Sequence, residues 1–462
     1  MKRYSNDREI RKLQEEYENS QKENRYPKFG AEDFADLAQY YYENGEPDTA
    51  KEVADTAQSV YPHSDPVTLF FVRYAILEEN DMEKAGELLE SIADKSSDDF
   101  VFDKAEWLVY GKRADEASRL LADHINLVWG DTEVANYVED ACRLFLNFNY
   151  ADIARTWLQR MPDKKSERYI LLLAEVKRVA GDWEGCSNVL GKLVEKNPFS
   201  SAGWVELSKI QYDLGRKEES AESYGYALAI DPDNLDALLV KGDILVAAGK
   251  YVEAEECYNR YLDAYPASPA VLNQLAYTLF CESEDNLPKS LELLQKAKRY
   301  VNHIHEKSIY ADILQTEATT LAGLGKFDEA MADVEELGKL KVWKDDDVEF
   351  VRAHIYVQSG KPLEGCLVYD MILRRSHWPI DMMVRMAPSF YMGNFFEIGN
   401  YEVSQTLAVH PESEYTAELL AVKAVFAKKC KNEAEYEEFR DRAMEKDENK
   451  AISILKILEE EE

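Results

Sequence analysis

Residues 201–232 read SAGWVELSKIQYDLGRKEESAESYGYALAIDP, and this stretch contains two helical stripes joined by a glycine. Trp204, Leu207, Ser208 and Gln211 recur at i, i+3, i+4 and i+7, which predicts one helix before Gly215. Ser220, Tyr224, Ala227 and Leu228 form the stripe of a second helix after it. Gly215 can adopt the left-handed conformation that ends a helix. Pro232 cannot extend the second helix, so it separates this helix pair from the next.

The helix pair is one copy of a repeat with a period of 34 residues. Three residue types keep this interval independently, which indicates tandem copies of one supersecondary unit. The matching positions are Pro198, Pro232 and Pro266; Gly181, Gly215 and Gly249; and Tyr224 and Tyr258.

The repeat resembles the tetratricopeptide repeat family. That family has a bulky residue at unit position 4, small residues at positions 8, 20 and 27, and proline at position 32. Units that begin near residues 31, 167, 201 and 235 fit the pattern well. Their position 8 holds Ala38, Ala174, Ser208 and Gly242, and their position 20 holds Ala50, Cys186, Ser220 and Ala254. The resemblance implies an all-α fold, an α-α superhelix (solenoid) of tandem helix-turn-helix units.

Weaker copies of the repeat extend the predicted solenoid over residues 29–447. They begin near 269, 311, 346 and 385, with degenerate copies near 65, 97 and 134, so we expect about 11 units. A closing helical pair is predicted at 414–429 and 433–445. Residues 1–28 are expected to form a charged arm or loose helix, and residues 448–462 a cap and acidic tail. The period breaks at 300–309 and 374–381, where either hinges or loops for a partner would fit.

The charge balance limits the possible partners. The chain has 55 basic and 89 acidic residues, a formal net charge of −34. This charge repels phosphate groups, so neither nucleic acid nor an anionic membrane is expected as a partner. A neutral to basic protein or peptide fits better. The alternative interpretation is that the acidic surface only keeps the molecule soluble.

The six cysteines are widely spaced, and the N-terminal residues lack the apolar run of a signal peptide. No stretch approaches about 18 uninterrupted apolar residues, the length that spans a membrane. Scattered cysteines without an export signal are typical of a reducing compartment, so we predict a cytoplasmic protein.

Motifs for catalysis or cofactor binding are missing from the sequence. No glycine-rich phosphate-binding motif occurs, and His303 and His305 lack the partners of a zinc motif. Cys186 and Cys257 fall on helical stripes, where a cysteine packs as a small apolar residue. We therefore expect neither an enzyme nor a bound cofactor or metal.

The resemblance also implies a binding surface, because the first helix of each unit lines the concave face in this family. In the first unit the corresponding positions hold Glu32, Asp36, Gln39, Tyr42 and Glu43, which form an acidic surface. From residue 269 onward the lining becomes polar, aromatic and nearly uncharged, a composition suited to a peptide backbone and its side chains. The candidate partner-binding residues are Asn273, Gln274, Tyr277, Phe280, Gln315, Thr316, Thr319, His354 and Phe396. Packing between neighbouring units is the alternative role of such residues.

Two functions from different classes follow. The first is a non-catalytic scaffold or adaptor that binds a protein or an extended peptide in the concave groove of the superhelix. The second is a regulatory or sensor protein whose superhelix binds a small ligand or signalling peptide. A copurified protein would favour the first function, and a copurified small molecule the second.

Overall fold

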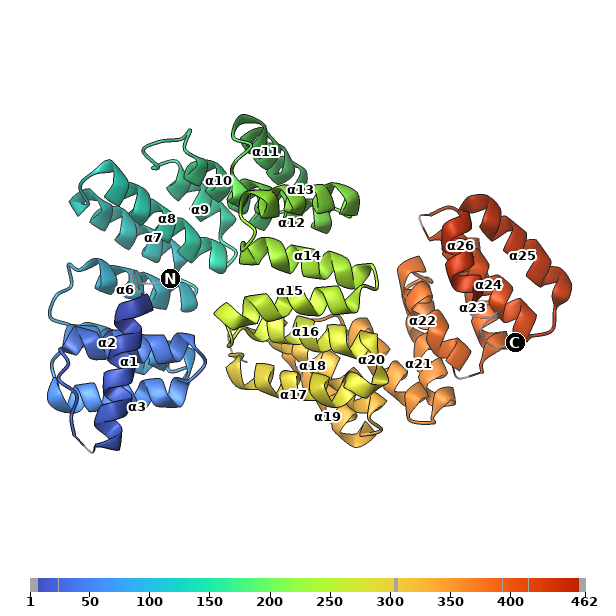
Figure 1. The fold of residues 1–462 in the computed structure, drawn as a ribbon, viewed down its shortest axis with the longest axis horizontal. Coiled ribbons are helices and arrows are strands. Elements are labelled where there is room, and N and C mark those ends of the chain that lie inside the picture. Colours follow the sequence, from blue (N-terminus) through green and yellow to red (C-terminus); the bar gives the residue numbers. More distant parts are fainter. Residues whose placement is uncertain (1–6, 24, 303–305, 393, 414, 457–462) are drawn as a thin grey trace. The chain divides into compact units, whose positions relative to one another are not determined.

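The computed structural model describes residues 7–23, 25–302, 306–392, 394–413 and 415–456. These residues form α-helices joined by short connections, and no β-strand occurs among them. Consecutive helices follow one another in pairs, as Figure 1 shows for α12 to α15. The predicted all-α fold of repeated helix pairs is confirmed. None of the helices in the described ranges is long and apolar enough to cross a membrane.

The chain divides into two compact units. The first unit contains residues 1–282 and 295–306, and the second contains residues 283–294 and 307–462. The helices that belong wholly to the first unit are α1 Asp7–Lys22, α2 Ala31–Glu43, α3 Pro47–Val60, α4 Asp65–Leu77, α5 Met82–Ser91, α6 Asp98–Tyr110, α7 Ala114–His124, α8 Asp131–Asn147, α9 Ala151–Leu158, α10 Glu167–Val179, α11 Trp183–Lys196, α12 Ser201–Asp213, α13 Lys217–Ile230, α14 Leu235–Ala247, α15 Tyr251–Ala264 and α16 Pro269–Glu282.

The second unit begins at Ser283, directly after α16 and before a 3-10 turn at Glu284–Asn286. Helix α17, Leu287–Tyr300, contributes its first residues to the second unit and its last residues to the first. The remaining helices are α18 Lys307–Gly323, α19 Phe327–Leu340, α20 Asp345–Gln358, α21 Pro362–Arg375, α22 Ile380–Met392, α23 Phe396–Val409, α24 Thr416–Lys429, α25 Glu433–Lys446 and α26 Glu448–Leu455.

The turn inside each regular unit depends on its glycine. Gly181, Gly215 and Gly249 have φ angles of 77°, 76° and 73°. An L-residue with a Cβ atom is strained in this left-handed region, whereas glycine is not. The glycines that keep the 34-residue period therefore end the first helix of their units, as the sequence predicted.

The small residues at unit positions 8 and 20 lie where the two helices of a pair touch. Ser208 and Ser220 are both fully buried, and their hydroxyl oxygens lie 3.0 Å apart. Each hydroxyl also donates to the backbone carbonyl of the other serine. In the next unit a Cβ atom on Gly242 would lie 2.7 Å from the ring of Tyr258. Close helix crossing explains why these positions stay small.

The register of the irregular units differs from the prediction. The first helices of the units expected near 97 and 134 begin at Asp98 and Asp131, and that of the unit expected near 385 begins at Ile380. Pro388 lies inside this last helix. A repeat with length slips has no fixed spacing from which its start can be counted, which explains these shifts.

The N-terminal segment contains a docked helix. Ile10 and Tyr17 of α1 are only 4% and 6% exposed, and they pack in the same apolar cluster as Phe34 and Leu37 of α2. The division of the chain into arm, solenoid and tail remains a prediction, and residues 457–462 of the expected acidic tail lie outside the described residues.

Candidate binding groove of the first unit

Two neighbouring cavities lie along the first helices of the first four helix pairs. Their volumes are about 640 and 990 Å3, and both are lined by Gln39, Arg73, Phe102 and Asp140, one residue each from α2, α4, α6 and α8. Glu32 and Asp36 line the smaller cavity, and Tyr42 and Glu43 the larger. All five α2 residues expected on the concave face are therefore in the walls. We call the two cavities together the acidic groove.

Carboxylates dominate the walls of the acidic groove. The smaller cavity has six carboxylates and one guanidinium, that of Arg73. The larger cavity also has six carboxylates, with three guanidinium groups from Arg73, Arg143 and Arg299. One of these cations is already engaged, because Arg73 Nε lies 3.7 Å from Asp103 Oδ2. The net negative potential of such a wall attracts cations and repels anions.

Asp140 lines both cavities of the groove, and its acidity is strongly altered. Burial, followed by the adjacent charge of Glu139, raises the pKa of Asp140 to about 6. The charge of the groove therefore changes near neutral pH.

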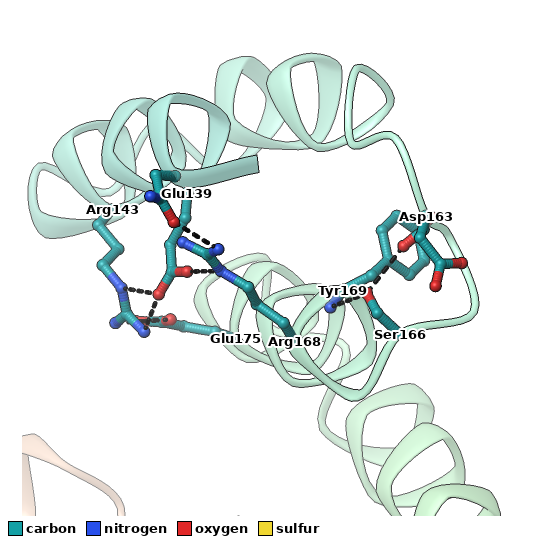
Figure 2. A network of polar contacts seen from close by, with 8 residues as sticks. Glu139, Arg143, Asp163, Ser166, Arg168, Tyr169 and Glu175 are labelled. Carbon is teal, nitrogen blue, oxygen red and sulfur yellow. Dashed lines mark hydrogen bonds and ion pairs between the residues drawn. The ribbon is translucent and has the colours of Figure 1, made fainter. Parts of the chain in front are cut away.

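A polar network joins α8 to α10, as Figure 2 shows, and two of its members, Asn136 and Arg143, line the groove. Glu139 accepts hydrogen bonds from Arg143, at 2.9 Å, and from Arg168. Arg168 also donates to Asn136 Oδ1 at 2.7 Å, and Arg143 lies 3.6 Å from Glu175. Burial acts to raise the pKa of Glu139, but the two arginines outweigh it and the pKa is lowered. Arg143 is thus neutralised by two carboxylates and adds little positive charge to the groove.

The segment that follows α17 completes the larger cavity. Asn302 Nδ2 donates to Leu77 O at 2.8 Å and to Glu78 Oε1 at 3.3 Å. Glu78 Oε1 also accepts from Tyr42 OH at 2.7 Å. The two contacts of Asn302 join residues more than 220 positions apart within the first unit. Sequence reasoning missed Asn302, because a single polar residue in an irregular segment follows no period.

Four of the predicted site residues lie on α16, in the first unit. Gln274 Nε2 donates to Asp243 Oδ1 at 2.9 Å. Tyr277 is 45% exposed and stacks on Phe280, with ring centroids 6.4 Å apart. Asn273 is half-buried, and its Oδ1 has no hydrogen-bond partner among the described residues. Tyr277 is therefore the member of this set that a partner can reach most easily.

The other five predicted residues, Gln315, Thr316, Thr319, His354 and Phe396, lie in the second unit. Thr316 is only 4% exposed and donates to the carbonyl of Asp312, so it offers a partner almost no surface. His354 Nδ1 lies 3.2 Å from Ser389 Oγ, and burial lowers the pKa of His354.

Phe396 does not lie on the first helix of its pair, where we expected it. Helix α22 ends at Met392, and Phe396 is the first residue of α23. Its ring packs edge-on against Tyr391, with centroids 5.6 Å apart. The shifted start of this irregular unit explains the error. The nine predicted residues are divided between the two units, four in the first and five in the second.

The part of the chain that the structure describes offers little evidence of a metal site or of a reactive cysteine. No group of three or more His, Cys, Asp or Glu side chains there is arranged to hold a metal ion. His303 and His305 lie outside the described residues. Cys186 and Cys257 are both buried, and burial raises the pKa of Cys186 to about 11. A thiol with a raised pKa is a poor nucleophile at neutral pH.

The fold and groove define a class of protein: an α-helical repeat protein with cavities along the first helices of its first four helix pairs. Residues 171–234 and 205–269 match the family model described as tetratricopeptide repeat. The middle of the chain, residues 171–269, thus contains tetratricopeptide repeats, in agreement with the resemblance seen in its sequence. This fold is commonly a scaffold for protein interactions, and the family is generally non-catalytic.

Solved structures with similar chains are distant in sequence. The Cut9–Hcn1 hetero-tetramer of APC/C has a chain with 13% identity and a TM-score of 0.42, over 97% of this chain and 96% of that one. A monomeric IFIT1 mutant with Gppp-AAAA has 14% identity and a TM-score of 0.47, over 95% of each chain. TTC0263, a tetratricopeptide protein of Thermus thermophilus, has 19% identity and a TM-score of 0.35, over 42% of this chain and all of that one. No curated protein matches the sequence.

Proposed function

We propose that this protein is a non-catalytic scaffold whose first unit binds a basic protein segment in the acidic groove. The observation that carries the proposal is the lining of the groove, where carboxylates from four successive repeat pairs outnumber guanidinium groups. A helix pair repeated along the chain presents its side chains at regular intervals, which suits an extended segment.

The carboxylates of the acidic groove and the polar and aromatic residues of α16 have different roles in this proposal. The carboxylates attract a basic segment from a distance and speed its association. Aromatic and amide side chains, including the predicted Tyr277, Phe280, Asn273 and Gln274, contribute contacts that select its sequence. The five predicted residues of the second unit remain a separate prediction.

We also propose that the protein acts in a reducing compartment, the cytoplasm. All six cysteines are free thiols, and four of them are buried. An oxidising compartment favours disulfides, whereas buried single thiols persist in a reducing one.

Affinity copurification with matched charge variants tests the scaffold function. The groove variant is Glu32→Lys with Asp36→Lys on α2. The control is Glu218→Lys with Glu222→Lys on α13, which has the same spacing, the same change in charge and an equivalent position near the start of a helix. Neither control residue lines a cavity of the acidic groove.

We expect the unaltered chain and the control to retain a stoichiometric protein partner that the groove variant loses. Equal retention by both variants would contradict a role for the acidic groove. The second candidate function, a sensor for a small ligand or signalling peptide, is favoured by a smaller tyrosine-lined cavity in the same unit. Copurification of a small molecule in place of a protein would support it.

A further inference from the structure

A third cavity of the first unit has walls of a different composition. It has a volume of about 350 Å3, at the small end of the range of about 300–1,000 Å3 for ligand sites. Four tyrosines from three helices line it, together with one carboxylate. These residues are Tyr212 of α12, Tyr251 and Tyr258 of α15, Tyr277 of α16, and Asp243 of α14. We call it the tyrosine cavity.

Only one oxygen of the Asp243 carboxylate accepts hydrogen bonds from its neighbours. Tyr258 OH donates to Asp243 Oδ1 at 2.7 Å, and Gln274 Nε2 donates to the same oxygen at 2.9 Å. Among the described residues, no donor reaches Oδ2 and no cation lies within ion-pair distance of the carboxylate. Burial raises the pKa of Asp243, and the nearby carboxylate of Asp213 raises it further. The negative charge of Asp243 therefore lacks a positive counterpart among the residues that the structure describes.

The chemistry of the tyrosine cavity selects among ligand classes. An anion would be repelled by Asp243, and a neutral apolar group would bury this carboxylate without compensation. A cation meets both the open carboxylate oxygen and the negative faces of tyrosine rings. Such cation–π contacts contribute about 0.5–2 kcal/mol each, more when water is excluded.

We propose that the tyrosine cavity binds the cationic side chain of a lysine, a methylated lysine or an arginine in a protein segment. The proposal rests on the proposed function, since the segment is the one that the first unit holds. The size of the cavity suits one side chain, and the acidic groove of the same unit concentrates basic segments near it. Tyr277, an exposed wall residue, is where the side chain enters.

The test uses the full chain and probes that differ only in charge. One set is a labelled Gly/Ser peptide with a single central lysine, trimethyllysine or arginine, compared with the same peptide carrying norleucine. The other is choline, compared with its neutral isostere 3,3-dimethylbutan-1-ol. Binding is measured by fluorescence anisotropy for the peptides and by saturation-transfer NMR for the small probes.

The variants distinguish the effect of the Asp243 charge from the effect of the aromatic wall. Asp243→Asn removes the charge but keeps an oxygen that can accept from Tyr258 and Gln274. Tyr277→Leu removes an aromatic wall at an exposed position. Asp263→Asn, an exposed residue of α15 outside the cavity, is the control with the same change in net charge. Circular dichroism melts show whether each variant is folded.

We expect the cationic peptides to bind more tightly than the norleucine peptide, and Asp243→Asn to weaken them at least about tenfold. Tyr277→Leu should weaken them about threefold to tenfold, and Asp263→Asn should have no effect. Equal binding of the norleucine peptide, or unchanged binding in folded Asp243→Asn, would overturn the proposal. Binding of choline without binding of any cationic peptide would overturn the assignment to a protein side chain.

The two proposals fail separately. If the groove variant loses the copurified partner but Asp243→Asn leaves binding of the cation probes unchanged, the scaffold function stands and the proposed role of the tyrosine cavity is wrong. If the probes respond to Asp243→Asn but no partner depends on the acidic groove, the cavity binds cations and the proposed function is wrong.

Discussion

The ionisation of Asp140, a single residue of the acidic groove, changes the folding stability of the protein. Its folded-state pKa of about 6 lies above the ordinary value of 3.8, so the folded protein binds this proton more tightly than the unfolded chain. Ionisation of Asp140 therefore lowers the free energy of unfolding as pH rises between these two values. The full reduction is present above about pH 6.

Asp140→Asn should remove this cost. We expect the variant to be more stable than the unaltered chain by about 1 kcal/mol at pH 8, a figure reduced from the pKa difference because the side chain is partly exposed to solvent. The gain should shrink at pH 5. Urea denaturation at both pH values measures it, with Asp263→Asn as the control. An equal gain at both pH values would show that the amide acts through packing and not through charge.

Ala254 occupies the small position 20 of its repeat and is completely buried. A phenylalanine at this position cannot fit between the two helices without moving one of them. We expect Ala254→Phe to destabilise the protein by about 1–3 kcal/mol through overpacking. Glu256→Phe adds the same ring at an exposed position of the same helix and should change stability little. Thermal melts that fail to separate the two variants would show that the assigned repeat register is wrong.

At the scale of helices, the regular repeats could be predicted from the sequence almost to the residue. The units expected near 31, 167, 201 and 235 begin at Ala31, Glu167, Ser201 and Leu235. Glycine, proline and small residues at fixed spacing each have a local cause, so their positions determine where these helices start and end.

The irregular elements could not be placed in this way. Repeats of variable length lack the fixed spacing. For this reason the residues of α6 and α8 that line the groove could not be assigned to it from the sequence. The three apolar residues of the first segment bury little surface by themselves, which made a loose arm plausible. In the structure α1 is docked, because Ile10 and Tyr17 complete a cluster that α2 already forms. The stability of α1 thus depends on a neighbour that its own sequence does not reveal.

This dependence leads to a prediction for α1. Tyr17→Ala removes the buried ring that packs near Tyr41, with centroids 6.5 Å apart. We expect the amides of α1 to lose hydrogen-exchange protection, while those of α12 to α15 keep it, because local opening follows local contacts. Glu15→Ala, at an exposed position of the same helix, should leave the protection unchanged. Loss of protection throughout the first unit would show that α1 supports the whole unit.

At the scale of the whole molecule, the acidic groove combines local and distant contributions. Residues of α2 were predictable because they hold the inward positions of a recognisable repeat. The contact of Asn302 with Leu77 joins the two ends of a long run of repeats, and its sequence separation puts it beyond any periodic argument. The tyrosine cavity could be predicted only in part. Gln274 and Tyr277 were expected at a binding surface, whereas the uncompensated charge of Asp243 was recognisable only from the structure.

The net charge of −34 provides the last prediction. Carboxylates in such excess repel one another in the folded state, and this repulsion lowers the stability of compact units. Many of the described ion pairs join exposed side chains, such as Lys51 with Asp55, and exposed pairs contribute only about 0–1 kcal/mol each. Raising NaCl from about 0.01 to 0.15 M shortens the Debye length from about 30 to about 8 Å, so it screens the long-range repulsion more than the close pairs.

We therefore expect the Tm of the first unfolding transition to rise by a few degrees over this range of NaCl. Potassium chloride should have the same effect, because screening depends on ionic strength and not on the identity of the cation. Glu218→Lys with Glu222→Lys makes the net charge less negative by four and should reduce the response to salt. A Tm that falls as salt is added would mean that attractive ion pairs outweigh the repulsion. In that case the acidic residues would stabilise the fold through specific partners, and the net charge would not explain their abundance.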